Sequence, residues 1–246
     1  MGLSFASLDS APASDLLAWA IATYGRRFAV VTSFQLEGMV VLDIAARLDP
    51  QVRVITLDTG RLPDETYRMI DLVRDRYGVQ VEVILPDAGE VGRMVALHGV
   101  NLFYREVPLR RLCCHFRKVL PLERALRDVD AIAVGLRRGQ SEQRAGVPKI
   151  DRGATPAKLS PLADWTRDEL EAYQAAHHVP VHPLYAKGYT SIGCAPCTRA
   201  VAADEAERAG RWWWETEADK ECGLHFSATG QVERKLDVLI SEVVSA

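Results

Sequence analysis

The stretch Phe28-Ala-Val-Val-Thr-Ser33-Phe34-Gln-Leu-Glu37-Gly38 joins a short apolar run to a polar loop and to the start of a helical segment. Residues 28–33 are typical of a buried strand, and the apolar spacing of residues 37–47 predicts a helix. In parallel α/β sheets, ligands bind at the carboxyl ends of the strands, which is where such a loop lies. The backbone N–H groups of this loop and the helix N-terminus are suited to hold an anion. The stretch therefore predicts an α/β fold with an anion site at this edge.

Strand-like and helix-like segments alternate beyond this stretch. Strands are expected at residues 28–33, 52–58, 80–85 and 130–135, and helices at residues 14–24, 37–47, 63–77, 89–98, 111–127 and 166–177. Repeated strand–helix units predict a mostly parallel, twisted sheet with helices on both faces. From residue 179 the pattern changes to prolines, glycines, cysteines and tryptophans. We therefore expect an α/β domain at residues 1–178 and a C-terminal segment at residues 179–246 that completes the active site.

The composition narrows the class of protein. The chain has 246 residues, of which 48% are hydrophobic and 26% charged, with a net charge of −3. This near-neutral balance argues against a general nucleic-acid or anionic-membrane binder, although it allows a local basic pocket. Residues 1–14 carry no secretory signal, and the longest apolar runs are too short to span a bilayer. We expect a cytoplasmic protein without nucleic-acid or membrane partners, in which thiols stay reduced.

Two further loops at expected strand ends carry polar residues. Leu57-Asp-Thr-Gly60 is a polar turn, and Gly135-Leu-Arg137-Arg138-Gly-Gln-Ser141 leads on to Arg144. Arginines among glycine and serine are placed to wrap a phosphate or sulfate, which their planar guanidinium groups match. Taken singly, each of the three loops is more readily explained as an ordinary strand-to-helix turn. This explanation is weakest for the arginine loop.

A second arginine pair, Arg208 and Arg211, precedes the tryptophans at positions 212–214. Residues three apart share one helix face, so both guanidinium groups could converge on one anion. An exposed helix whose aromatic residues pack on the body explains the pattern equally well.

Five cysteines occur in the chain, four of them in two close pairs: Cys113-Cys114 and Cys194-x-x-Cys197. Two close pairs suit four thiolate ligands around one metal centre. On the residues alone, structural zinc and an iron–sulfur cluster are about equally consistent with the pairs. Inert buried cysteines would explain one or two of the four but hardly all of them.

The fifth cysteine, Cys222, stands apart in Lys220-Glu-Cys-Gly-Leu-His225. Lys220 and His225 are near enough in the sequence to activate its thiol if the fold brings them close, which makes Cys222 a candidate nucleophile. Taken alone, a tail cysteine of no consequence is an equally good explanation.

Together these motifs resemble the assimilatory sulfonucleotide reductases of the adenine nucleotide α-hydrolase fold, in particular the iron–sulfur adenylyl-sulfate (APS) reductase type. The resemblance runs from about residue 32 to residue 225. Its motifs are Ser33-Phe-Gln-Leu-Glu37, Leu57-Asp-Thr-Gly60, Cys113-Cys-His-Phe-Arg-Lys118, Gly135-Leu-Arg-Arg138 with Gln140-Ser141, Cys194-Ala-Pro-Cys197, Arg208-Ala-Gly-Arg211-Trp-Trp-Trp214 and Lys220-Glu-Cys-Gly-Leu-His225. The chain departs from the pattern at Gly38, where such loops often carry a second acid, and in a helix-like extension at residues 232–245.

The resemblance implies a [4Fe-4S] cluster held by Cys113, Cys114, Cys194 and Cys197. It also implies a nucleotide-binding domain at residues 1–178. The substrate-binding residues would be Ser33, Phe34, Gln35, Leu57, Lys118, Gly135, Arg137, Arg138, Arg144, Arg208 and Arg211. Within this set, Lys118 would lie between the cluster and the sulfate of the substrate, and Arg144, Arg208 and Arg211 would neutralise the phosphosulfate. Cys222 would attack the sulfate sulfur, expelling AMP and forming an enzyme S-sulfocysteine.

The cysteine count also constrains the partners that the resemblance implies. With four thiols bound to the cluster, no resolving cysteine remains, so both electrons would come from thioredoxin or a similar dithiol reductant. A homo-oligomer is compatible with the sequence. The alternatives are a 3′-phosphoadenylyl-sulfate (PAPS) reductase of the same mechanism, an ATP-dependent tRNA thiolation enzyme, and a zinc-stabilised nucleotide sensor. The net charge of −3 counts against tRNA, and a sensor leaves Cys222 unexplained.

Overall fold

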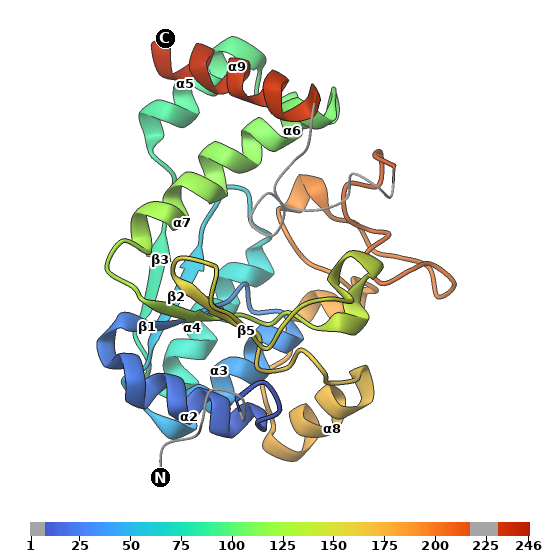
Figure 1. Ribbon diagram of the computed structural model, residues 1–246. Helices are drawn as coiled ribbons and strands as arrows, with labels where there is room; N and C mark the ends of the chain where they lie inside the picture. Colours follow the sequence, from blue (N-terminus) through green and yellow to red (C-terminus); the bar gives the residue numbers. More distant parts are fainter. Residues whose placement is uncertain (1–7, 217–230) are drawn as a thin grey trace.

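The computed structural model describes residues 8–216 and 231–246 of the chain. Within these residues a six-stranded sheet forms the centre of the fold, with the strand order β3-β2-β1-β4-β6-β5 (Figure 1). The strands are β1 (Phe28–Val31), β2 (Arg53–Leu57), β3 (Val81–Ile84), β4 (Ala131–Ala133), β5 (Ile150–Asp151) and β6 (Ala157–Leu159). All neighbouring strands pair in parallel except β5 and β6, which are antiparallel. The predicted α/β class with a mostly parallel sheet is confirmed.

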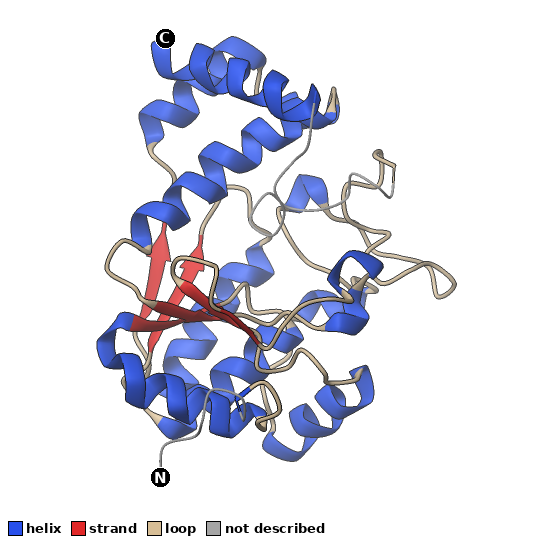
Figure 2. Cartoon of the chain, viewed as in Figure 1, coloured by secondary structure: helices blue, strands red, loops and turns tan. Residues whose placement is uncertain are grey.

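Helices surround the sheet (Figure 2). They are α2 (Ala13–Tyr24), α3 (Leu36–Leu48), α4 (Asp64–Tyr77), α5 (Ala88–His98), α6 (Val107–Cys114), α7 (Leu120–Ala125), α8 (Arg167–His177) and α9 (Gln231–Ser245). Local sequence explains several of their ends. The predicted capping box opens α8, because Thr166 and Glu169 exchange hydrogen bonds with each other's backbone N–H groups. Gly78 ends α4 with a φ of 66°, a left-handed conformation that glycine adopts without strain.

The structure differs from the sequence-based expectation in two places. The single helix expected at residues 111–127 is two α-helices, α6 and α7, joined by a π-helical turn at His115–Val119. Strands β5 and β6 were not expected, because two or three residues are too few to show a periodic pattern. They extend the sheet beyond β4, and β6 adds one wall to the pocket described below.

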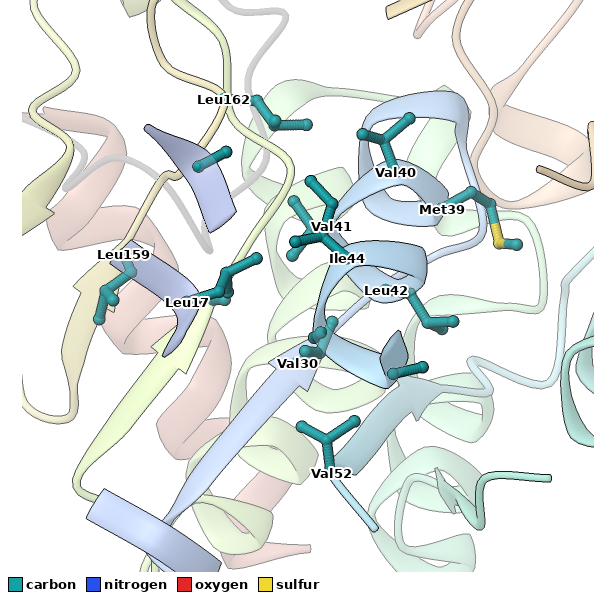
Figure 3. Close-up of a cluster of buried hydrophobic side chains, with 14 of the residues drawn as sticks. Leu17, Val30, Met39, Val40, Val41, Leu42, Ile44, Val52, Leu159 and Leu162 are labelled. Carbon is teal, nitrogen blue, oxygen red and sulfur yellow. The ribbon is translucent and has the colours of Figure 1, made fainter. Parts of the chain in front are cut away.

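The two faces of the sheet bury different sets of residues, as alternation along each strand requires. Phe28 and Val30 of β1 face one cluster, whereas Ala29 between them faces the other. The first cluster contains most of α3, whose Val41 and Ile44 lie in one group of buried side chains with Leu17 of α2 and Val30 of β1 (Figure 3). The opposite face packs against Leu122 and Leu126 at the end of α7. Helices therefore cover both faces of the sheet.

A separate apolar cluster lies where α5, α6 and α9 meet, at the end of the molecule farthest from α2 (Figure 1). Leu239 and Val243 of α9 are buried against this cluster, and Lys235 forms an ion pair with Glu106 just before α6. The helix-like extension predicted near the C-terminus is thus a helix packed on the element that carries Cys113 and Cys114. The division expected at residue 178 stays a prediction.

No helix in the described part of the chain combines the length and the apolar character that crossing a membrane would require.

Buried His182 makes folding stability depend on pH. Its Nδ1 accepts a hydrogen bond from the Leu184 N–H (3.3 Å), and its Nε2 lies 3.0 Å from the Thr66 hydroxyl. Burial lowers the pKa of His182 to about 4, against an opposing effect of Glu65. The unfolded chain, with a His pKa near 6.5, takes up the proton first. Stability from this group is therefore complete above about pH 6.5 and is lost as the pH falls toward 4.

We expect this loss to reach about 3 kcal/mol at pH 4, measured as the free energy of unfolding in denaturant at a series of pH values. His182→Asn is the matched control, since asparagine keeps an acceptor for the Leu184 N–H but does not titrate. Identical pH slopes for the wild-type chain and His182→Asn would contradict the assignment.

Candidate active site

A pocket of about 450 Å³ lies at the carboxyl ends of β1, β2 and β4. Small-molecule sites typically have volumes of roughly 300–1,000 Å³, so this pocket has the size of a nucleotide site. Its walls come from the three predicted loops, from the π-helical turn and α7, from β6, and from two parts of the C-terminal segment, residues 191–194 and 207–212. The fold thus brings together segments more than 150 residues apart in the sequence.

The loop between β1 and α3 is held in an unusual conformation. Phe34 has a φ of 59°, its ring is fully buried, and its N–H donates to the Thr32 hydroxyl (3.0 Å). A left-handed backbone at a bulky residue is strained and persists only where the surroundings enforce it. Gln35 helps to do so, because its side-chain oxygen accepts from the Ile192 N–H at 2.7 Å. The loop is therefore fastened to the C-terminal segment before any ligand binds.

Two glycines allow backbones to meet beside this loop. A Cβ on Gly135 would lie 2.6 Å from the Gly38 nitrogen and 2.8 Å from the Glu37 carbonyl carbon. Since both neighbours are backbone atoms, they have little freedom to move. A Cβ on Gly38 would lie 2.4 Å from the Thr32 hydroxyl, so a side chain there would displace this hydroxyl from its hydrogen bond with the Phe34 N–H.

Basic side chains outnumber acidic ones in the lining of the pocket. Five basic side chains line it, namely Lys118, Arg144, Lys158, Arg208 and Arg211, against three carboxylates, Glu37, Glu123 and Glu207. Burial lowers the pKa of Lys158. Arg211 is 6% exposed and donates to the Ile192 carbonyl. An excess of cations in a partly enclosed pocket favours an anionic ligand.

One buried arginine holds the carboxylates at the edge of the pocket. Arg137 lies 3.3 Å from Glu37 and 3.6 Å from Glu207. Burial raises the pKa of Glu207, and the nearby charge of Glu37 raises it further. Arg137 therefore balances the charge of the wall and does not itself line the pocket.

A second, smaller cavity adjoins the pocket and is lined by all four paired cysteines: Cys113, Cys114, Cys194 and Cys197. Cys113 and Cys114 come from the last turn of α6, directly before the π-helical turn, and the other two from the loop at residues 194–197. The four side chains are buried. The Thr59 hydroxyl, after β2, lies 3.2 Å from the Cys194 sulfur.

The chemistry of this cavity fits a bound metal centre. Burial raises the pKa of Cys113, and burial followed by the charge of Cys194 raises the pKa of Cys197 to about 12. Buried thiolates need a metal or cations to hold them in the ionised state. Cationic Arg110, Arg117 and Lys118 line the same cavity. Four thiols with nearby cations are a suitable donor set for an iron–sulfur cluster.

Zinc and a four-iron cluster make different demands on four cysteine ligands. In the described part of the chain, no three cysteine, histidine, aspartate or glutamate side chains are grouped as ligands of one ion. Zinc requires four ligands at roughly 2.0–2.3 Å from one point, whereas each cysteine of a four-iron cluster binds a different iron.

Three residues line both the pocket and the cysteine cavity: Lys118, Cys194 and Trp212. The guanidinium groups of Arg110 and Arg211 each lie 4.6 Å from the centre of the Trp212 ring. Arg110 in turn donates two hydrogen bonds to Glu215, at 3.0 and 2.8 Å, with both side chains buried. This pair joins α6 to the segment that carries Arg211 and Trp212.

Most of the predicted substrate-binding residues meet in the pocket. Eight line it: Ser33, Gln35, Leu57, Lys118, Gly135, Arg144, Arg208 and Arg211. Phe34 and Arg137 are buried behind the lining, and Arg138 is exposed and donates to the Val147 carbonyl. Cys222 lies outside the described residues. Contact with substrate stays a prediction for all of them.

Sequence reasoning missed several residues of the site. Lys158 lies on β6, a strand too short to be expected. Thr59 and Glu207 lie beside Leu57 and Arg208, which were predicted to bind substrate, but were not themselves predicted. A basic residue next to a proline turn carried no signal of its own. Only the pairing of β6 with β4 brings Lys158 to the pocket wall.

Comparison with known proteins bears directly on this geometry. A family profile described as the phosphoadenosine phosphosulfate reductase domain matches residues 27–200, which include every wall of the pocket except residues 207–212 and all four buried cysteines. The chain belongs to this family. Among similar members, adenosine 5′-phosphosulfate reductase of Burkholderia cepacia is 49% identical over 198 residues, covering 80% of this chain and 79% of the relative. The protein of the same name from Agrobacterium fabrum is 41% identical, covering 86% of this chain and 82% of the relative.

Solved structures agree with the family and with the fold. The phosphoadenylyl-sulfate (PAPS) reductase of Candida auris, in a phosphate complex, has a TM-score of 0.66 and 26% identity, covering 82% of this chain and 99% of that one. The FMN adenylyltransferase of Candida glabrata has a TM-score of 0.54 at 12% identity, covering 96% of this chain and 81% of that one, and shares the fold alone.

Proposed function

We propose that this protein is an APS reductase of assimilatory sulfate reduction, which converts APS to sulfite and AMP with electrons from thioredoxin or a similar dithiol. One observation carries the proposal: a cation-lined pocket of nucleotide size shares Lys118, Cys194 and Trp212 with a cavity of four buried cysteines. Identities of 41–49% to proteins named adenosine 5′-phosphosulfate reductase support APS as the substrate. Free thiols and a dithiol donor require a reducing compartment such as the cytoplasm.

In the proposed reaction, the Cys222 thiolate attacks the sulfur of APS. The bond between this sulfur and the bridging oxygen breaks, AMP leaves with the electron pair, and Cys222 becomes an S-sulfocysteine. Arg144, Arg208 and Arg211 stabilise the negative charge that develops on the phosphate. One thiolate of the dithiol then attacks the Cys222 sulfur and releases sulfite. The second thiol closes the disulfide of the reductant and restores the Cys222 thiol, which accounts for both electrons.

Cys113, Cys114, Cys194 and Cys197 would hold a [4Fe-4S] cluster. Held by these four thiols, the cluster would supply a charged group beside Lys118. The residues of the chain do the rest: the loop after β1 and Gly135 shape the nucleotide pocket, and Lys118 spans the two cavities.

PAPS is the second candidate substrate, since the Candida auris neighbour is a PAPS reductase and covers most of this chain. It would require a place for one more phosphate in the same pocket, with an unchanged mechanism. The carboxylates Glu37 and Glu207 in the lining count against that further anion.

Anaerobic purification followed by an assay of sulfite release from APS and from PAPS with thioredoxin tests the proposal. We expect a brown protein that prefers APS by about tenfold or more, the effect of one unfavourable phosphate contact of roughly 1.4 kcal/mol. A preference for PAPS would keep the mechanism and change the substrate. A colourless, zinc-loaded protein that releases no sulfite, or one that releases pyrophosphate from ATP instead, would refute it.

A further inference from the structure

An exposed group of aromatic residues lies beside the cysteine cavity, outside the nucleotide pocket. Tyr104 and Trp213 are 43% and 40% exposed, and their ring centres are 6.4 Å apart. Trp214 packs against both, with ring centres 4.8 Å from Trp213 and 4.5 Å from Tyr104. Buried Phe103 lies beneath, 4.5 Å from Tyr104. We call Phe103, Tyr104, Trp213 and Trp214 the aromatic patch.

Tyr104 joins the patch to the loop that carries two of the cysteines. The Tyr104 hydroxyl donates to the carbonyl of Pro196, between Cys194 and Cys197, at 2.9 Å. Arg61 lies over the Phe103 ring at 5.1 Å and donates to the Val100 carbonyl at 2.6 Å. Val100, 53% exposed, extends the apolar surface. Rigid, exposed aromatic side chains of this kind contribute most of the binding energy in many protein interfaces.

Chain length limits where a reducing partner can bind. Cys222 follows Thr216 by six positions along the chain. Thr216 is the last residue before Cys222 that the structure describes. Six fully extended residues span at most about 21 Å. A folded dithiol protein of about 100 residues has a radius of gyration near 13 Å and is therefore wider than this reach. A partner whose dithiol reaches Cys222 therefore has its reacting face within about 21 Å of Thr216. Trp213 stands three residues before Thr216.

We infer that the aromatic patch is the docking surface for the folded, thioredoxin-like dithiol protein that reduces Cys222. This inference rests on the proposed function. It assigns Tyr104 and Trp213 to the second half of the reaction only, because neither lines the nucleotide pocket or the cysteine cavity. The patch therefore separates recognition of the reductant from recognition of the nucleotide.

The test measures the two half-reactions separately in the metal-loaded Trp213→Ala variant. In the first, enzyme is mixed with APS without reductant, and the S-sulfonated protein is followed by mass spectrometry. In the second, S-sulfonated enzyme is mixed with thioredoxin or with dithiothreitol, and sulfite release is timed. Dithiothreitol needs no docking surface. We expect the rate with thioredoxin to fall about 10- to 30-fold at limiting thioredoxin, as for an interface hot spot, with the other two rates unchanged.

Two further variants test whether the effect is specific to an aromatic ring at this position. Trp213→Phe, which keeps an aromatic ring, should recover most of the rate with thioredoxin. Leu72→Ala, which truncates a side chain 44% exposed on α4, should leave all three rates unchanged.

An unchanged rate with thioredoxin in Trp213→Ala would overturn the inference. So would an equal loss with dithiothreitol or in the first half-reaction, since either would mean that the patch serves residues 217–230 of the chain itself. If the wild-type chain is not S-sulfonated by APS at all, the proposed function fails instead, and the two failures are thereby distinguishable.

Discussion

Replacing Cys222 with serine is expected to abolish sulfite release, with a loss of about 10⁴-fold or more in turnover. A serine hydroxyl is scarcely ionised at neutral pH and is a far weaker nucleophile than a thiolate, so no sulfonated enzyme should form. Nucleotide binding should be nearly unchanged, because the residues that line the pocket are intact. The measurements are sulfite release, mass spectrometry of the enzyme after exposure to APS, and AMP affinity by calorimetry.

The visible spectrum of Cys222→Ser provides the decisive comparison. The four cysteines that line one cavity supply the four thiolates that a cluster needs, so the metal centre should survive in this variant. Cys197→Ser is the matched control and should lose it. Bleaching of Cys222→Ser to the same extent as Cys197→Ser would show that the roles of the cysteines are wrongly assigned.

Arg110→Met is expected to lower the free energy of unfolding by about 3–5 kcal/mol. Arg110 is fully buried, and its guanidinium group holds the buried carboxylate of Glu215 through two hydrogen bonds. Without it, a carboxylate is left in an apolar setting beside Trp212, and the loss of Coulomb attraction is not offset by water. Denaturant unfolding of identically loaded proteins measures the effect.

Two further variants separate the burial of the charge from the loss of a contact. Arg110→Met/Glu215→Leu removes both charges and should recover most of the stability, since two apolar residues pack where the ion pair was. Arg27→Met removes an exposed ion pair with Asp130, whose side chains are 57% and 45% exposed, and should cost less than about 1 kcal/mol. Equal losses for Arg110→Met and Arg27→Met would contradict the buried-charge account.

Several parts of the site could be predicted from the sequence because each depends on residues that are close together in the chain. The loop after β1 follows a run of buried apolar residues, and Gly135 follows another, so both were expected at the edge of a parallel sheet, where the pocket is. Two cysteine pairs at short spacing indicate a shared metal centre, and this spacing is visible directly in the sequence. The capping box at Thr166 is likewise complete within four residues.

Other features depend on residues that are far apart in the sequence, so no local pattern predicts them. Arg137 and Arg144 stood in the same arginine loop, yet Arg144 lines the pocket while Arg137 is buried between Glu37 and Glu207, which are 170 positions apart. No local rule separates the two arginines, because the choice depends on which carboxylates the fold places beside them.

The order of residues along the chain was thus enough to predict a parallel α/β sheet, the loops at its binding edge, and two cysteine pairs with one cysteine apart, since each follows from periodicity or short spacing. The tertiary structure was needed to join the cysteine cavity to the pocket through Lys118 and Trp212, and to add Lys158 from a strand of three residues. It was needed also to pair Arg110 with Glu215 across 105 positions. Contacts of that kind arise from packing and charge balance in three dimensions, which sequence periodicity does not encode.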